Sequence, residues 1–425
     1  MHCLTPATSP SRVRNSLHRH LHRRIQLNDW HYLSIDGDNL LTMIAVHAFN
    51  DLAPLLLRSL PQDFIQKSLR PDGATPIIIA AMTGNFDLLE QMMTHPFCRA
   101  QINQPAGCGA MPLTIAVSRC DIRMTKTLLH FGAHVDARLP DGSTPLMHAC
   151  RHGDPVLIKV LLSHSPDVNT VDQNNHNAVT YAVCNNRFIA LPLLHSLGAQ
   201  LDTRDAYAYT PLMHAIKCSA AASAIWLIEN QADINQINHK YRSALVIAVI
   251  NCCEQAMHML LKRPELIINQ ADDYQQTALM YACMHGRTTM VKALMNHPKL
   301  DVYLCNIFGE TAFTLAASNN QSEALSVLFS YPLMPDRQDA IVLDCLRAAR
   351  RNQFVDVIDT ILNRFRNIYQ SNCPRPTQEG QEITDYYKHF YGLGRASGMG
   401  LFSQRSTPPP CKRKKIASIQ KKMER

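Results

Sequence analysis

An alanine recurs at an almost constant spacing along most of this chain. Nine such alanines stand 33 to 36 residues apart: Ala45, Ala80, Ala116, Ala149, Ala182, Ala215, Ala248, Ala282 and Ala316. A tenth, Ala348, follows 32 residues later. A repeat of this length indicates stacked supersecondary units, because one unit is too small to bury its own apolar face. The sequence therefore predicts an extended array of nine units, starting near residues 37, 72, 108, 141, 174, 207, 240, 274 and 308.

Each unit carries signals for the start and the end of a short helix. The hydroxyl of a threonine can accept the free N–H groups of a helix start, and a proline fits the first helical position. These threonines are Thr75, Thr144, Thr210, Thr277 and Thr311. Residues that tolerate the left-handed conformation follow about two turns later: Gly84, Gly153, Asn186, Gly286 and Asn320. A second apolar helical segment then follows, as in residues 156–162.

Four units lack the threonine and begin instead at Leu40, Met111, Asn177 and Ser243. We therefore expect these four units to be less stable than the others and to depend mainly on their neighbours.

The openings Thr144-Pro145-Leu146 and Thr210-Pro211-Leu212, together with the 33-residue period, resemble the ankyrin repeat. The family usually has a histidine after Thr-Pro-Leu, whereas Met147 and Met213 stand there, with His148 and His214 one residue later. The resemblance implies an all-α solenoid of stacked helix-turn-helix units with hairpin fingers over residues 36–335. Residues 336–370 are then degenerate C-terminal capping helices. Such an array implies a surface that binds other proteins.

Aromatic residues occur in register at the expected fingertips, on successive fingers. They are Tyr207, Tyr209, Tyr241, Tyr274 and Phe308. Exposed aromatic side chains are good anchors for a partner, because they bring a large contact area at a small entropic cost. The alternative is that they pack against the adjacent finger. Arg151, His152 and Arg287 are further protein-binding candidates at the ends of first helices, with ordinary solvation as the alternative.

The formal charge of +8 lies at the two ends of the chain. Residues 1–30 hold five basic residues and one acidic residue, and residues 371–425 hold eleven and four, which leaves 26 basic and 29 acidic residues between them. Residues 1–35 form a basic amphipathic segment, for which a cap on the first repeat, a membrane-surface contact and a transit peptide are the hypotheses. Residues 371–425 are expected to be a flexible basic tail, with packing of its aromatic residues on the last repeat as the alternative. Its cluster Lys412, Arg413, Lys414 and Lys415 resembles a nuclear localisation signal.

The sequence predicts no cofactor, no metal site and no catalytic centre. The fourteen cysteines have no pairing at zinc spacing, and we expect reduced thiols, with Cys150 and Cys283 packed as small apolar residues. His18, His20 and His22 are interpreted as a solvated face, with adventitious nickel or zinc binding as the alternative. No apolar run approaches the ~18 to 20 residues of a membrane helix.

We therefore expect a non-enzymatic scaffold or adaptor that binds a partner protein inside the cell, in the cytoplasm or the nucleus. One alternative is an effector that an intracellular bacterium delivers into a host cell. Another is a nucleic-acid-associated regulator that acts through the basic ends, although nucleic acid is not expected to be the primary partner because the array itself is slightly acidic. A nuclear import receptor is a further expected partner of the tail.

Overall fold

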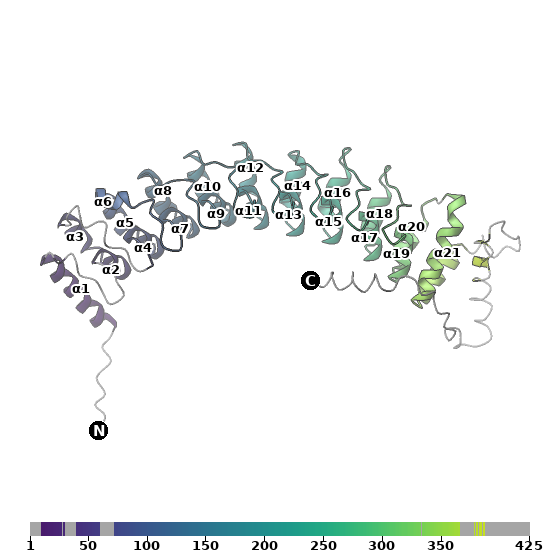
Figure 1. Cartoon of the computed structure of the whole chain (residues 1–425), viewed down its shortest axis with the longest axis horizontal. Coiled ribbons are helices and arrows are strands. Elements are labelled where there is room, and N and C mark those ends of the chain that lie inside the picture. The colour runs from purple at the N-terminus through teal and green to yellow at the C-terminus, as the bar shows by residue number, and fades with distance from the viewer. Residues whose placement is uncertain are drawn as a thin grey trace, which may run out of the picture. The chain divides into compact units, whose positions relative to one another are not determined.

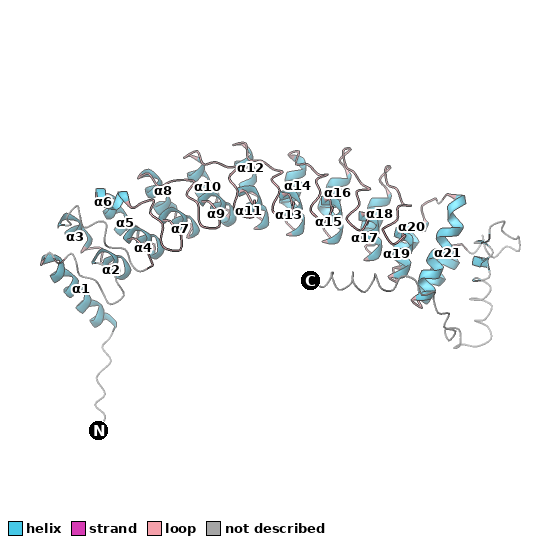
Figure 2. Cartoon of the chain, viewed as in Figure 1, coloured by secondary structure: helices cyan, strands magenta, loops and turns pink. Residues whose placement is uncertain are grey.

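The nine alanines that mark the repeat are all completely buried. Each lies in the first helix of its unit, where its small side chain allows a neighbouring helix to approach closely. The computed structural model describes residues 10–27, 29, 40–59, 72–332, 334–365, 378, 380, 382–384 and 386. Among these residues the structure is helical, with only two isolated bridges, Ile237 to Ser243 and Cys305 to Thr311. The all-α solenoid is confirmed (Figures 1 and 2).

The chain divides into two units, Met1–Ala278 and Leu279–Arg425. In the first unit, one layer holds the first helices of the repeats: α2 (Leu40–His47), α4 (Pro76–Thr83), α7 (Pro112–Ser118), α9 (Pro145–His152), α11 (Ala178–Cys184), α13 (Pro211–Lys217) and α15 (Ala244–Ile250). The other layer holds the second helices: α3 (Ala53–Ser59), α5 (Phe86–Met93), α8 (Ile122–His130), α10 (Pro155–Leu162), α12 (Ala190–His195), α14 (Ala221–Glu229) and α16 (Glu254–Leu261). A short helix, α6 (Pro96–Ala100), follows α5. Successive first helices contact one another along the whole row, which buries their apolar sides (Figure 1).

The second unit continues the same pattern. It contains most of α17 (Ala278–Met284), then α18 (Thr288–Met295), α19 (Ala312–Ser318), α20 (Ser322–Phe329), α21 (Pro335–Arg351) and α22 (Val355–Arg364). Helix α21 packs on α19, and α22 packs on α20. Phe329 contacts both Phe313 and Phe365, with ring centroids 5.5 and 5.0 Å apart. These two last helices occupy the region for which capping helices are predicted. Ala348 is predicted to be the tenth repeat alanine. In α21, however, the fully buried alanine is Ala349, and Ala348 is partly exposed.

The predicted helix caps are confirmed at four threonines. Thr75, Thr144, Thr210 and Thr311 each accept a hydrogen bond from the backbone N–H three residues later. The predicted left-handed residues Gly84, Gly153, Asn186, Gly286 and Asn320 all have φ between 54° and 79°. The local sequence signals thus set where the capped first helices begin. The five left-handed residues follow the first helices α4, α9, α11, α17 and α19.

Two of the four units without the threonine have a side-chain cap from another residue. The Oδ1 atom of Asn177 accepts the N–H of Thr180 at 3.0 Å, and Ser243 accepts the N–H of Val246 at 3.4 Å. Asn177 is fully buried, and its amide also donates to the Gln200 carbonyl at 2.9 Å. Asparagine and serine carry the same acceptor as threonine, so these helices start with equivalent caps.

The basic helix α1 (Pro10–Gln26) contacts the first repeat. Leu21 and Ile25 are buried, and His18 Nε2 lies 2.7 Å from Asp51 Oδ2 and edge-on to the Phe49 ring. Burial of this apolar side favours the capping hypothesis for residues 1–35 over a membrane contact, since a membrane helix would leave the same side exposed.

The few residues of 371–425 that the structure describes contact α21, which agrees with the alternative that the tail aromatics pack on the last helices. Ile383 is fully buried, Glu382 pairs with Arg347 of α21 at 2.8 Å, and the Tyr386 hydroxyl lies 3.2 Å from Arg350. The polar groups on either side of the buried Ile383 thus both contact α21. Lys412, Arg413, Lys414 and Lys415 lie outside the described residues. No helix within the described ranges combines the length and apolarity needed to cross a membrane.

We predict that Asn177→Ala lowers the free energy of unfolding by about 2 to 3 kcal/mol, because it removes a helix cap and leaves buried backbone groups without partners. Urea unfolding followed by circular dichroism measures this loss. Asn177→Ser is the matched control, since it keeps the capping oxygen and should lose less. An unchanged urea midpoint for Asn177→Ala would contradict the capping role.

Candidate protein-binding site

The turn that precedes a first helix is here called a finger, and five successive fingers are each built around one Asp or Asn side chain. In these fingers the residue is Asp172, Asp205, Asn238, Asp272 or Asn306. Its Oδ1 atom accepts two backbone N–H groups, two and four residues later. In the finger of Asp205 these donors are Tyr207 at 2.8 Å and Tyr209 at 2.7 Å. The finger is therefore held by its base residue, and the side chain at the tip is free to vary.

Neighbouring fingers are joined by backbone hydrogen bonds. In the first unit the Ala206 N–H donates to the Asn174 carbonyl at 3.1 Å, and the His239 N–H donates to the Tyr207 carbonyl at 3.1 Å. The Asp273 N–H donates to the Lys240 carbonyl in the same way, also at 3.1 Å. These bonds hold the backbones of adjacent tips side by side.

Each fingertip has two residues, and the second is left-handed. The second residues are Gly73, Gly109, Gly142, Asn175, Ala208, Tyr241, Gln275 and Gly309. Tyr207, Tyr274 and Phe308 occupy the first position of their tips, whereas Tyr241 occupies the second, with φ 56°. The prediction that these aromatics share one register is therefore wrong at Tyr241. A bulky residue in this conformation is unfavourable by about 1 to 2 kcal/mol.

The predicted aromatic anchors differ in exposure. The exposed fraction is 70% for Tyr207, 56% for Tyr241 and 53% for Phe308, while Tyr209 and Tyr274 are partly buried. The Tyr209 ring lies 5.4 Å from the His214 ring, and the Lys217 ammonium lies 5.1 Å from its centroid. Tyr209 thus packs against its own repeat, and Tyr207 and Tyr241 remain the exposed candidates in the first unit.

The first-helix candidates are less distinctive. Arg151 is exposed, and His152 and Arg287 are partly buried. The displaced family histidines contact their own fingers instead, since His148 Nε2 lies 3.0 Å from Ser143 Oγ and His214 Nε2 lies 2.9 Å from Asp205 Oδ2. Burial lowers the pKa of His148, and burial also lowers the pKa of His214 although the Asp205 carboxylate opposes this.

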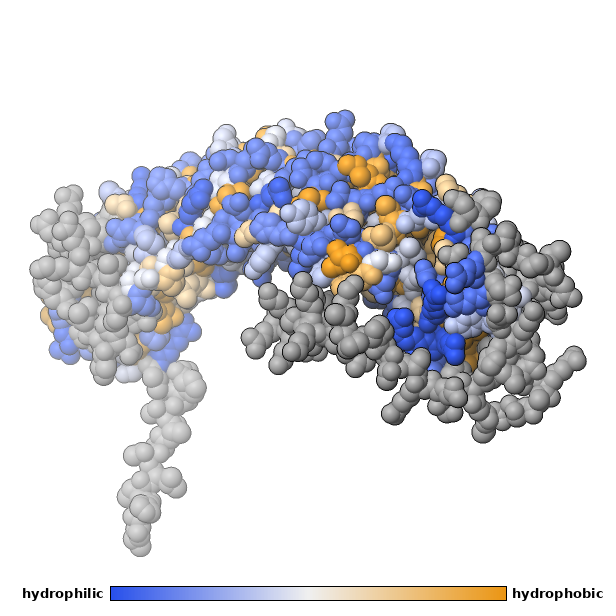
Figure 3. Space-filling model, turned by 45° about the vertical axis from the view of Figure 1, so that its right-hand side comes forward, coloured by the Kyte–Doolittle hydropathy of each residue, from blue (hydrophilic) through white to orange (hydrophobic). Residues whose placement is uncertain are grey.

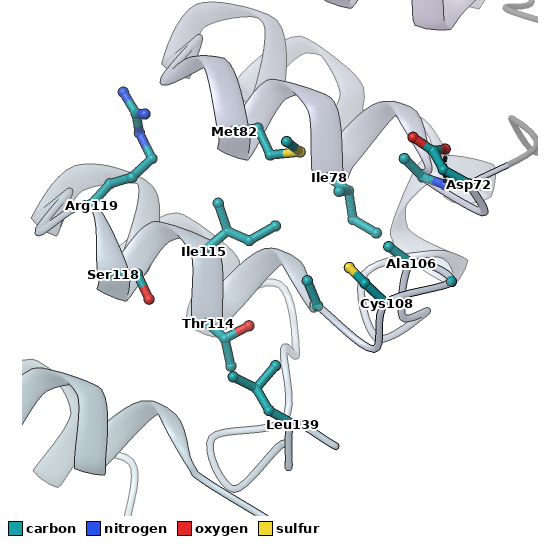
Figure 4. Close-up of a pocket in the computed structure, with 13 residues that line it drawn as sticks. Asp72, Ile78, Met82, Ala106, Cys108, Thr114, Ile115, Ser118, Arg119 and Leu139 are labelled. Carbon is teal, nitrogen blue, oxygen red and sulfur yellow. Dashed lines mark hydrogen bonds between the residues drawn. The ribbon is translucent and has the colours of Figure 1, made fainter. Parts of the chain in front are cut away.

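An apolar groove of about 710 Å³ lies in the first unit between α4, α7 and the adjoining fingers. Ile78 and Met82 from α4 face Ile115 from α7, with Cys108 and Ala106 at the finger end (Figure 4). Met82 is 57% exposed. Sequence analysis missed this groove. The sequence feature that could have indicated the groove is Ile115, an apolar residue at the helix position where other repeats have His148 or His214.

Apolar side chains elsewhere are exposed only in separate patches on the face that Figure 3 shows, which is mostly hydrophilic.

The predicted burial of Cys150 and Cys283 is confirmed. Burial raises the pKa of the Cys98 thiol to about 12, so this thiol is protonated at neutral pH. The His176, Asp205 and His214 side chains lie together where two successive fingers meet, and sequence analysis did not anticipate that grouping.

Two-helix repeats and fingers joined by backbone hydrogen bonds define a helical repeat solenoid. The family model described as ankyrin repeats (3 copies) matches residues 113–205, 157–238 and 245–339, which together make up more than half of the chain. The chain belongs to the ankyrin-repeat family. Ankyrin repeats are a general module of protein–protein interaction.

Curated relatives share the repeats over part of their length. The ankyrin repeat protein nuc-2 of Neurospora crassa is 27% identical over 177 residues, which are 41% of this chain and 16% of the relative. An ankyrin repeat protein of Fowlpox virus is 30% identical over 175 residues, 40% of this chain and 50% of the relative. Neurogenic locus notch homolog protein 1 of Xenopus tropicalis is 29% identical over 144 residues, 34% of this chain and 6% of the relative. The matches span half or less of these relatives.

We predict that Tyr241→Asn raises the free energy of unfolding by about 0.5 to 1 kcal/mol, because asparagine tolerates the left-handed conformation better than tyrosine. Asn175 holds the same position in another finger, with φ 62°. Tyr207→Asn is the matched control, since the first tip position is not left-handed and should give no gain. Thermal and urea unfolding measure both variants, and a loss of stability in Tyr241→Asn would show that the ring packs on the array.

Proposed function

We propose that the chain is a non-enzymatic scaffold that holds a partner protein against the fingers of its repeats. The observation that carries this proposal is the pair Tyr207 and Tyr241. Both rings are more than half exposed, and they stand on adjacent fingers joined by the His239 to Tyr207 backbone bond. Two neighbouring exposed aromatic side chains offer a partner a large apolar contact with few rotatable bonds.

The conformation of Tyr241 supports a binding role over a packing role. A left-handed tyrosine is less stable than glycine or asparagine at the same place, and the exposed ring gains little burial in return. A residue that costs stability and is largely exposed is better explained by contact with another molecule. The groove lined by Met82 and Ile115 lies on other repeats of the same unit and offers a second apolar contact.

The double variant Tyr207→Asn/Tyr241→Asn tests the proposal, because it converts both tips to residues that another finger, Asn174-Asn175, already carries. We expect the fold to be kept and the capture of partner proteins by the full chain to fall by at least about tenfold, as for the loss of aromatic hot spots. Affinity capture with quantitative mass spectrometry measures this difference.

Phe188→Asn is the matched control, since Phe188 is an exposed aromatic outside the fingers. Its capture profile should equal that of the wild-type chain. Equal profiles for the wild-type chain and the double variant would overturn the fingertip proposal, and a loss shared with Phe188→Asn would show that general surface apolarity is responsible.

We propose further that the cluster Lys412 to Lys415 directs the chain to the nucleus. Its support is sequence alone: four consecutive basic residues follow three prolines. Deleting residues 411–425 should move a tagged chain from the nucleus to the cytoplasm, as seen by fluorescence microscopy. An unchanged distribution would contradict the proposed import signal.

Delivery by an intracellular bacterium and nucleic-acid binding remain alternatives. Nucleic-acid binding that falls steeply with salt and needs the tail would favour the second of these.

A further inference from the structure

Three metal-ligand side chains converge where two successive fingers of the first unit meet. His176 follows the tip of one finger, Asp205 is the base residue of the next, and His214 lies in α13. The Asp205 Oδ2 atom lies 2.9 Å from His214 Nε2 and 3.6 Å from His176 Nε2. The exposed fractions of the side chains are 6% for Asp205, 12% for His214 and 27% for His176.

This spacing suits one transition-metal ion. The ligand atoms of the three residues all lie within 4.8 Å of one another. Two donors on a tetrahedral Zn²⁺ with bonds of about 2.1 Å are about 3.4 Å apart, so small side-chain movements would bring the three donors into place. Two imidazoles with one carboxylate form a ligand set that Zn²⁺ accepts, with a fourth position left for water or another ligand.

The surrounding side chains orient these ligands. The Oδ1 atom of Asp205 is held by the N–H groups of Tyr207 and Tyr209, which leaves Oδ2 to face the two histidines. On the other side, His176 Nδ1 lies 3.5 Å from Asp172 Oδ2, which accepts a hydrogen bond from the Tyr181 hydroxyl at 2.9 Å. A carboxylate behind the remote nitrogen of a histidine is the usual support of a metal ligand.

A structural hydrogen-bond network explains only part of this arrangement. The bond between His214 and Asp205 links the first helix to its own finger, as His148 and Ser143 do in an earlier repeat. His176 is not needed for that link, because its Nε2 atom lies beyond hydrogen-bond distance from Asp205. Nevertheless, Nε2 and Nδ1 of His176 each approach a carboxylate oxygen, at 3.6 and 3.5 Å.

We propose that His176, Asp205 and His214 bind a divalent transition metal, Zn²⁺ by their chemistry, and that the ion links two successive repeats. His176 belongs to one repeat and the other two ligands to the next, so the bound ion adds a cross-link to the backbone bond between Ala206 and Asn174. This site is independent of the proposed function, because its ligands differ from the exposed tip residues.

Asp205→Asn is the sharpest test of the site. Asn238 and Asn306 occupy the equivalent base position in their own fingers and each accept two backbone N–H groups, two and four residues later. Asparagine at position 205 should therefore keep the finger while it removes the anionic ligand. The full chain, without an added histidine tag and freed of metal by a chelator, is titrated with Zn²⁺ by calorimetry and with Co²⁺ by visible spectroscopy. We expect about one tight equivalent with tetrahedral Co²⁺ bands in the wild-type chain, and at least about tenfold weaker binding in Asp205→Asn.

Two further variants keep the result decisive. His176→Ala removes the most exposed ligand and should weaken Zn²⁺ binding to the same extent. This variant provides the test if Asp205→Asn unfolds when metal is removed with chelator. His239→Ala removes an exposed histidine of the next finger and should change nothing. Adventitious binding at His18 to His22 would survive all three variants. Equal Zn²⁺ affinity in the wild-type chain, Asp205→Asn and His176→Ala would overturn the proposal, as would the absence of a tight equivalent in the wild-type chain.

Discussion

Each repeat of this chain is stable only because the next repeat covers its apolar face. The completely buried alanine in each described first helix is small enough to let the neighbouring first helix pack closely against it. Larger side chains there would push the helices apart, and a polar one would be buried without a partner. The spacing of the fingers and the aromatic contacts that Phe329 makes with Phe313 and Phe365 depend on this stacking.

The fingers show how such an array can change its surface without changing its fold. One Asp or Asn side chain holds each of five fingers through two backbone N–H groups, and backbone bonds join one finger to the next. Neither interaction depends on the side chain at the tip. Tyr207 and Tyr241 can therefore be replaced in principle without unfolding the repeat, and the Oδ2 atom of Asp205 is available to two histidines.

Much of the fold could be predicted because its signals are local. The threonine caps, the left-handed residues and the alanine period each depend on a few neighbouring residues, and the structure confirms them at four threonines, five left-handed positions and nine alanines. The candidate site was harder. Tyr241 differs from Tyr207 by one position in the turn, and Ile383 is buried in a polar segment whose residues Glu382 and Tyr386 contact α21. Neither fact follows from spacing alone.

The sequence alone determined the family, the number and phase of the repeats and the choice of aromatic candidates, because a periodic chain encodes the same local structure in each unit. Only the tertiary structure decided which aromatics are exposed, where apolar groove residues such as Met82 and Ile115 face each other, and that His176 meets Asp205 and His214. The physical reason is that these features join side chains from different repeats. Their distances depend on the stacking of whole helices, which no short stretch of sequence specifies.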